Sequence, residues 1–257
     1  MAELPDLTVF ANILSRMFKN KVLEKLDVTV PKKLNVKVQE LQSALEGCIL
    51  ESVERAGKTL QFHFSGENVL GLHLMLRGEL VELSEDKTPK FQIMAFHFEK
   101  GKGFAVIDML KQATATLHPL KAAAPDALEI TKEDFTALVA KKHTIIKTLL
   151  MDQKSLRGIG NSYADEILYH ACVSPFSTAS AIPQWDVDKI FKSIDIVLNT
   201  AIKEIALANG NELAGELKDF MKIHNAALKV TSNGDVIKRD KIGGRTTYYT
   251  QAQQLFL

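Results

Sequence analysis

The spacing of apolar residues changes near residue 120, and this change limits the folds open to the chain. Before it, apolar residues come in short runs separated by turn signals such as SGEN and EKGKG, as is typical of β-strands. After it, they repeat every three to four residues, which is the period of an amphipathic helix. The stretch KAAAPDALEI separates the two patterns. The sequence therefore predicts an α+β protein with a strand-rich first half and a helical second half.

The same periodicity places individual helices. Apolar residues from Leu7 to Phe18 fall on one face, so a helix is expected after Pro5. In the second half, helices are predicted near residues 132–141, 145–152, 162–171 and 186–208. Asp165 and Glu166 come near the start of the third of these, where acidic side chains suit the helix dipole.

The last forty residues change character again. Asn233-Gly234 tolerates positive φ, which favours a hairpin turn between residues 229–230 and 236–237, and GGRTTYY is interpreted as a return strand. Two domains are therefore predicted. An N-terminal helix and a β-sandwich occupy residues 1–120, and a helical domain occupies residues 126–257, with the hairpin at residues 228–257.

Composition excludes several classes of protein. The 257 residues include 32 basic and 31 acidic side chains, so the net charge of +1 is unlike that of a histone-like polycation. No apolar run is long enough to span a membrane, and the N-terminus has no signal-peptide pattern. Cys48 and Cys172 are the only cysteines, so neither a disulfide framework nor a four-cysteine metal site is expected. We expect a cytoplasmic protein, nucleoid-associated if bacterial, with no membrane partner.

The stretch from Lys147 to Leu168 is the most informative segment. Gly158 and Gly160 permit a tight turn, and Asn161 follows where a helix begins. The amide groups at that helix start, together with the Asn161 side chain, would form an anion site suited to a nucleic-acid phosphate. An ordinary helical corner with a capped helix is the alternative interpretation.

Five segments in order along the chain carry a family resemblance. These are Met1–Asp6, Arg55–Lys58, Leu72–Gly78, Lys147–Leu168 and Gly244–Tyr249. They resemble the N-terminus, two strand motifs, the helix-two-turns-helix (H2TH) element and the C-terminal finger of the formamidopyrimidine-DNA glycosylase and endonuclease VIII family of base-excision repair enzymes. Ribosomal and topoisomerase proteins also contain such helical elements, but they lack the matching N-terminus.

The resemblance implies an enzyme that removes a damaged, oxidised base from flipped DNA and cleaves the resulting abasic (AP) site as an AP lyase. The alternatives are a catalytically impaired binder of abasic or distorted DNA and an RNA-binding module. The expected partner is damaged DNA, including single-stranded or abasic DNA, and the expected state is a monomer. The segment between Leu213 and Leu228 is shorter than in 8-oxoguanine enzymes and looks more like that of endonuclease VIII, which favours oxidised pyrimidines.

The resemblance also implies three catalytic residues. Ala2 stands where the family has the N-terminal proline whose amine attacks the sugar, and removal of Met1 would expose a primary amine there. Glu3 would be the general acid, and Lys58 would hold the phosphate beside the damaged nucleotide. The corresponding structural alternatives are a space-filling alanine, a helix-capping acid and a solvated strand-edge lysine. Asp6 replaces a family glutamate, so a relay through that carboxylate is not expected.

DNA contacts are implied at His73, Lys111, Lys147, Asn161 and Arg245. For Arg245, which the family pattern places on phosphates, surface decoration is the alternative. The family fills the gap left by a flipped base with a methionine, an arginine and a phenylalanine. Here Leu76 takes the methionine position, and the segment from Asp108 to Ala113 lacks the aromatic residue, so poor reading of the opposite base is expected.

The finger lacks the residues that would bind zinc. The family has two Cys-x-x-Cys pairs, whereas this chain has Val230, Asn233, Thr250 and Gln253 at those positions. Without thiolates a tetrahedral zinc site cannot form there. The sequence therefore predicts a zincless finger, with neither metal nor cofactor.

Overall fold

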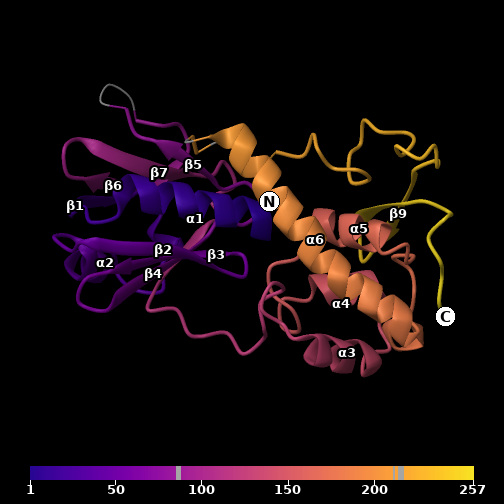
Figure 1. Ribbon diagram of the computed structural model, residues 1–257. Helices are drawn as coiled ribbons and strands as arrows, with labels where there is room; N and C mark the ends of the chain where they lie inside the picture. Colours follow the sequence, from indigo (N-terminus) through magenta and orange to yellow (C-terminus); the bar gives the residue numbers. More distant parts are fainter. Residues whose placement is uncertain (85–87, 211, 214–216) are drawn as a thin grey trace. The chain divides into compact units, whose positions relative to one another are not determined.

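The computed structural model describes residues 1–84, 88–210, 212–213 and 217–257 (Figure 1). The chain divides into two compact units. The first comprises Met1–Lys121 and Ile205–Glu216, and the second comprises Ala122–Glu204 and Leu217–Leu257. Residues 214–216, within the shortened segment noted above, lie outside the described residues. No helix in the described part of the chain is long and apolar enough to cross a membrane.

The first unit is a sandwich of two four-stranded antiparallel sheets. One sheet has the order β1-β6-β7-β5, with bounds Leu23–Val28, Gln92–Phe98, Lys102–Ile107 and Glu79–Glu82. The other has the order β2-β3-β4-β8, with bounds Leu50–Ala56, Thr59–Phe64, Asn68–His73 and Thr114–Leu117. Burial alternates along β3, as expected for a strand with one face toward a core. The predicted β-sandwich is confirmed.

Aromatic side chains fill the space between the sheets. Phe96 and Phe104 stack with ring centroids 4.5 Å apart, and Phe62 stacks on both. Helix α1 (Leu4–Phe18) lies along the sandwich and contacts β2, and Phe18 at its end stacks on Phe98 (Figure 1). Burial of each such ring contributes about 1.5–3 kcal/mol, so Phe18 anchors the last turn of α1 to the core of the sandwich.

One helix of this unit was not predicted. Helix α2 (Val38–Leu45) follows a short 3₁₀ turn, η1 (Pro31–Lys33), and buries only Leu41 and Leu45. Two buried residues four apart are too weak a period to distinguish from the short apolar runs of neighbouring strands.

The second unit contains the helices predicted for the second half. They are α3 (Lys132–Ala140), α4 (Ile146–Met151), α5 (Asn161–His170) and α6 (Gln184–Asn209), with a 3₁₀ turn, η2 (Ala179–Ala181), before α6. The last residues of α6 belong to the first unit. Each observed boundary lies within two residues of the predicted one. Thr131 caps α3 by accepting a hydrogen bond from the N–H of Asp134 at 3.1 Å.

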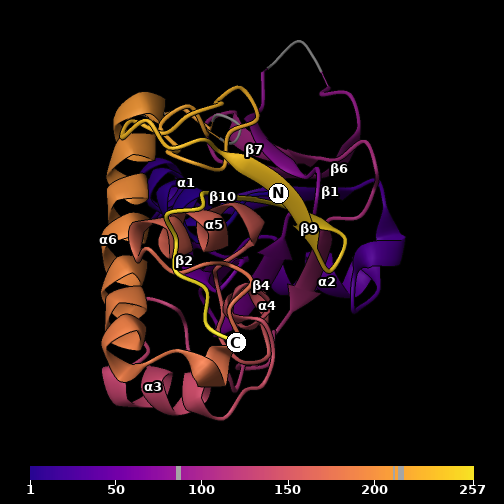
Figure 2. The ribbon, with the colours of Figure 1, turned by 90° about the vertical axis from the view of Figure 1, so that its right-hand side faces the viewer.

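The C-terminal hairpin turns at a different place from the one predicted. Strands β9 (Lys238–Ile242) and β10 (Arg245–Tyr249) pair antiparallel around Gly243 and Gly244, whose φ values are 55° and 76°. Two residues with positive φ form the tight turn that suits a twisted hairpin. The turn at Gly234 also exists, but it closes only the isolated bridge between Val230 and Val236. In Figure 2 the hairpin crosses the view in yellow, and β10 contacts α5.

Candidate functional site

In the first unit, the predicted catalytic residues at the N-terminus lie at the buried start of α1. Glu3 is the N-cap residue, and its N–H donates to Oδ2 of Asp6 at 2.9 Å in a capping box. Glu3 is 3% exposed and Asp6 is 2% exposed, while the Ala2 side chain belongs to the core. Helix capping, the structural alternative for this segment, therefore occurs. It is compatible with a chemical role, because it also fixes Glu3 directly beside Ala2.

The turn that carries Lys58 is tied to the same helix. Arg55 donates from Nε to Oγ1 of Thr8 at 2.9 Å and from a terminal nitrogen to the carbonyl of Gly57 at 3.1 Å. Gly57 has a φ of 62°, which suits the two-residue turn joining β2 to β3. One guanidinium group thus links the first turns of α1 to the Gly57-Lys58 turn.

His73 ends β4 and lies within reach of the Lys58 charge. Burial, followed by the Lys58 ammonium, lowers the pKa of His73 from its ordinary value. Nδ1 of His73 accepts a hydrogen bond from the N–H of Met75 at 3.0 Å. The neutral ring therefore carries its proton on Nε2, so His73 can donate a hydrogen bond without being charged.

A rigid loop with an apolar tip carries Lys111. The buried carboxylate of Asp108 accepts hydrogen bonds from the N–H groups of Leu110, Gln112 and Ala113 at 2.7 to 3.0 Å. Lys111 is exposed at a φ of 53°. Beside it, Met109 is 61% exposed and Leu110 is 46% exposed. Sequence reasoning noted the missing aromatic residue but missed these two exposed apolar side chains, because only the fold shows that they point outward.

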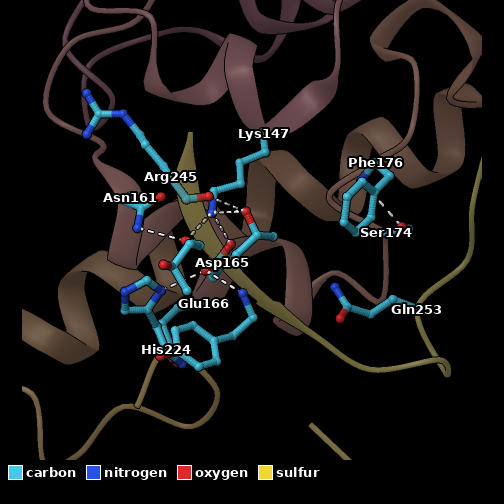
Figure 3. Close-up of polar contacts among 12 residues, drawn as sticks. Lys147, Asn161, Asp165, Glu166, Ser174, Phe176, His224, Arg245 and Gln253 are labelled. Atoms are coloured by element: carbon cyan, nitrogen blue, oxygen red, sulfur yellow. Dashed lines mark hydrogen bonds and ion pairs between the residues drawn. The ribbon is translucent and has the colours of Figure 1, made fainter. Parts of the chain in front are cut away.

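In the second unit, Asn161 is hydrogen-bonded to the hairpin residue that follows Arg245. Asn161 is the first residue of α5, after the N-cap residue Gly160, and its Nδ2 donates to the carbonyl of Thr246 at 3.0 Å. The exposed Arg245 side chain points away from the buried groups behind it (Figure 3). The Asn161 side chain thus positions the hairpin from the start of α5.

Lys147 is placed differently from the expected DNA contact. It is fully buried, its ammonium forms an ion pair with Oδ1 of Asp165 at 2.7 Å, and it donates to Oγ1 of Thr247 at 2.8 Å (Figure 3). It also donates to the carbonyl of Thr246 at 3.3 Å. A charge held in this way is not at the surface where a phosphate would approach. Lys147 therefore joins α4 to the hairpin instead of reading DNA.

The sequence placed Asp165 and Glu166 near a helix start, where acids suit the dipole, but both lie beyond the first turn of α5 and their carboxylates bond to other segments. The other oxygen of Asp165, Oδ2, lies 2.6 Å from Nδ1 of His224 and accepts the N–H of Tyr248 at 3.0 Å. Glu166 accepts three backbone N–H groups, from residues 222, 223 and 224, at 2.7 to 3.0 Å. Both carboxylates are buried and hold distant segments on α5 (Figure 3). Apart from Lys147, their partners lie more than 50 residues away along the chain, where no local pattern could reveal them.

Hydrogen bonds also secure the segment after the hairpin. Gln253 accepts the N–H of Thr250 through Oε1 at 2.8 Å and donates from Nε2 to the carbonyl of Val173 at 2.8 Å. The next residue, Gln254, donates its N–H to the carbonyl of Cys172 at 2.9 Å. Three or more His, Cys, Asp or Glu side chains arranged to hold a metal are not found in the described part of the chain.

Comparison with known proteins places this arrangement in a family. Residues 1–115 match the formamidopyrimidine-DNA glycosylase N-terminal domain, and residues 122–209 match the formamidopyrimidine-DNA glycosylase H2TH domain. The chain belongs to the formamidopyrimidine-DNA glycosylase family. A formamidopyrimidine-DNA glycosylase of Shouchella clausii is 30% identical, with 97% of each chain covered. That of Mycoplasma mobile is 27% identical over 99% of this chain and 100% of its own.

Solved structures of the family share the fold. The Lactococcus lactis enzyme in complex with abasic-site DNA has a TM-score of 0.90 at 22% identity, covering 98% of this chain and 100% of its own. A variant of the same enzyme in complex with a Fapy-dG-containing DNA has a TM-score of 0.89 at 22% identity, with the same coverage. The predicted fold class, with sandwich, helical domain and terminal hairpin, is therefore confirmed.

Within the formamidopyrimidine-DNA glycosylase family pattern, the finger positions now have observed surroundings. Val230 is 51% exposed and forms only an isolated bridge, whereas Gln253 is buried and Thr250 is 1% exposed. Gln253 links the segment after the hairpin to the carbonyl of Val173. Lys147 and Asp165 bond to Thr247 and Tyr248 of the hairpin itself.

Proposed function

We propose that this chain is a base-excision repair DNA glycosylase with AP lyase activity, which removes an oxidised base from flipped DNA. The observation that carries the proposal is the buried Glu3 beside Ala2 at the start of α1, in a chain that belongs to the formamidopyrimidine-DNA glycosylase family. Loss of Met1 exposes the Ala2 amine next to this carboxyl. The reference pKa of such an amine is about 7.7–8.0, so a useful fraction is unprotonated at neutral pH.

The reaction follows from these two groups. The Ala2 amine attacks the sugar C1′ and forms a Schiff base, the damaged base leaves, and Glu3 supplies a proton as the sugar ring opens. The Schiff base then permits elimination of the phosphate, which cleaves the strand. The imine of a primary amine can lose its proton and stop withdrawing electrons, whereas that of proline cannot, so this chain should react more slowly than members with an N-terminal proline.

The DNA grip is assigned to charged and donor groups on several elements. Lys58, Lys111 and Arg245 bind phosphates, His73 donates from Nε2, and the N–H groups at the start of α5 beside Asn161 hold a further phosphate. Damaged DNA, including abasic or single-stranded DNA, is the proposed partner of a monomeric protein. In a bacterial cell this substrate places the protein in the cytoplasm with the nucleoid.

The apolar side chains of the first unit suit the space left by a flipped base. Leu76 is 50% exposed, and Met109 and Leu110 project from the loop that Asp108 holds. Extruding a base leaves unstacked neighbours, and apolar side chains can fill that gap. Because they offer no hydrogen bonds to the orphaned base, the enzyme should discriminate poorly among opposite bases.

A catalytically impaired DNA binder is the less favoured alternative. Glu3 and the Gly57-Lys58 turn are retained, and Arg55 joins that turn to α1 as a working site would need. These features favour an enzyme over a binding module.

Borohydride trapping on abasic DNA tests the proposal. Protein that has lost Met1 should form a covalent adduct, whereas protein with an N-terminal extension should form none, because its α-amine is displaced from Glu3. Both forms should bind the same DNA in the absence of borohydride. Equal trapping by both forms would contradict the role of Ala2 and would transfer the nucleophile to a lysine such as Lys58.

A further inference from the structure

A cavity of about 470 Å³ lies within the second unit, lined by α5, α6 and loops on either side of the hairpin. Its volume falls within the range of about 300–1,000 Å³ that is usual for small-molecule sites. Tyr163, Ala201 and Met221 line it and are at most 3% exposed, so they form an apolar floor. None of the groups assigned above to the DNA reaction lines this cavity.

A buried hydroxyl in the cavity lining lacks a partner. Thr250 is 1% exposed and lines the cavity, and its N–H is used by Gln253. Its Oγ1 has no hydrogen-bond partner among the residues that the structure describes. A buried hydroxyl without a partner is unfavourable, and a ligand that hydrogen-bonds to it removes that cost.

A nucleophilic thiol stands at the rim of the same cavity. Cys172 is exposed and has a φ of 58°. Its backbone is held on both sides, because its N–H donates to the carbonyl of Tyr169 at 3.0 Å and its carbonyl accepts the N–H of Gln254 at 2.9 Å. By contrast, Cys48 is half-buried and its Sγ lies 3.4 Å from the carbonyl of Ala44. Thiol exchange depends on access, which favours Cys172.

The charges around the cavity disfavour an anionic ligand, because Glu166 and Asp235 line it with only one cationic residue, Lys222, among the described residues. Glu166 already accepts three backbone N–H groups. Asp235 and Lys222 carry opposite charges, and burial followed by the charge of Lys222 lowers the pKa of His170, which favours its neutral form. An amide group matches the Thr250 hydroxyl, which can both donate and accept, and aliphatic carbons match the floor.

We propose that Cys172 forms a reversible mixed disulfide with an uncharged, amide-bearing aliphatic thiol of the pantetheine kind, and that the cavity receives the rest of that molecule. The Cys172 thiolate attacks one sulfur of the corresponding low-molecular-weight disulfide. A new S–S bond forms, the old S–S bond breaks, and the leaving thiolate takes up the proton that Cys172 released. This reaction is independent of the Ala2 amine.

Pantethine, glutathione disulfide and 2-hydroxyethyl disulfide are the probes for a test on the full chain. Intact mass and peptide mapping give the rate of adduct formation at each cysteine. Cys172 should react with pantethine at least tenfold faster than Cys48 does, and faster than with the other two disulfides. Cys172→Ser should leave only the slow reaction at Cys48. A faster reaction of Cys172 with glutathione disulfide than with pantethine would overturn the uncharged class of ligand.

Two substitutions separate a built site from a merely exposed thiol. Thr250→Val removes the hydroxyl and Ala201→Leu fills the floor, and each should slow the pantethine reaction about fivefold while leaving the reaction with the small 2-hydroxyethyl disulfide unchanged. Thr250→Ser keeps the hydroxyl and should retain the parent rate. Melting temperatures show that each variant is folded. Parent-like rates with pantethine in both Thr250→Val and Ala201→Leu would overturn the proposal.

Discussion

The N-terminal site and the C-terminal hairpin both depart from the family pattern, but their departures differ in kind. In the proposed reaction one atom at the N-terminus must perform chemistry, so Ala2 in place of proline would change the reactivity of the nucleophile itself. The proposed role of the hairpin requires only that the Arg245 side chain be held in position, and different interactions can do this. The structure offers such support through Lys147 and Asp165, which bond to Thr247 and Tyr248 of the hairpin, and through the amide of Gln253. Scaffold interactions are exchangeable where reacting groups are not.

The most severe test of this contrast is Glu3→Gln. Glutamine can still accept a hydrogen bond at the helix start but cannot supply the proton, so base excision should fall by about 100- to 10,000-fold with little change in melting temperature. Single-turnover excision assays and thermal unfolding measure the two effects. Asp6→Asn is the matched control, since it alters the same capping box without touching the proposed acid. If Glu3→Gln lowers the melting temperature and leaves excision unchanged, Glu3 is only a helix cap.

On the hairpin side, the equivalent test is Asp165→Asn. It leaves the Lys147 ammonium buried without its counter-charge, and breaking a buried pair in this way costs about 3–5 kcal/mol. Urea unfolding should show the loss in the second unit, accompanied by weaker DNA binding. Asp188→Asn is the control, because it removes the same charge from an ion pair with the exposed Lys132, where a loss of about 1 kcal/mol or less is expected. Equal losses from the two substitutions would show that the buried pair does not hold the hairpin.

Some elements of the fold could be predicted from the sequence and others could not. The amphipathic period located α3 to α6 to within two residues, because each helix buries one continuous face. Helix α2 escaped notice, since Leu41 and Leu45 alone carry its period. The Asn233-Gly234 pair does form a turn, but Gly243 and Gly244 form the turn of the longer hairpin. Local turn propensity could not show which of the two turns would join the longer strands.

The candidate site also contains residues that the sequence could identify and residues whose surroundings it could not. Ala2, Glu3, Lys58 and Arg245 were found through local motifs, and their roles remain predictions. Lys147 was assigned to DNA because it lies in a motif-rich stretch. Its ammonium instead forms an ion pair with the carboxylate of Asp165, 18 residues later, and only folding brings the two groups into contact. Burial of a charged side chain depends on partners distant in sequence, so a one-dimensional pattern cannot distinguish a buried lysine from a phosphate-binding one.

Arg245→Ala should have a more modest effect than either substitution above. Loss of one phosphate contact should weaken binding about tenfold for lesion-containing and undamaged DNA alike, and should reduce the salt dependence of binding by about one counterion. Titrations at several salt concentrations measure both quantities. Arg239→Ala removes an exposed arginine from the other strand of the same hairpin and is the control. Parent-like affinity and salt dependence in Arg245→Ala would show that the hairpin tip does not grip DNA.

Treatment with a chelator should have no effect at all, and it tests whether the hairpin is held without a metal. Val230, Asn233, Thr250 and Gln253 supply no thiolate, and the described part of the chain has no group of three or more His, Cys, Asp or Glu side chains arranged to hold a metal. Purified protein should therefore contain no stoichiometric zinc by elemental analysis, and a chelator should change neither its melting temperature nor its DNA affinity. A family member with four finger cysteines, treated in parallel, should lose DNA binding, because its finger depends on the metal. One tightly held zinc per chain would mean that His224 and non-cysteine partners form a site, and that the hairpin is held by a metal after all.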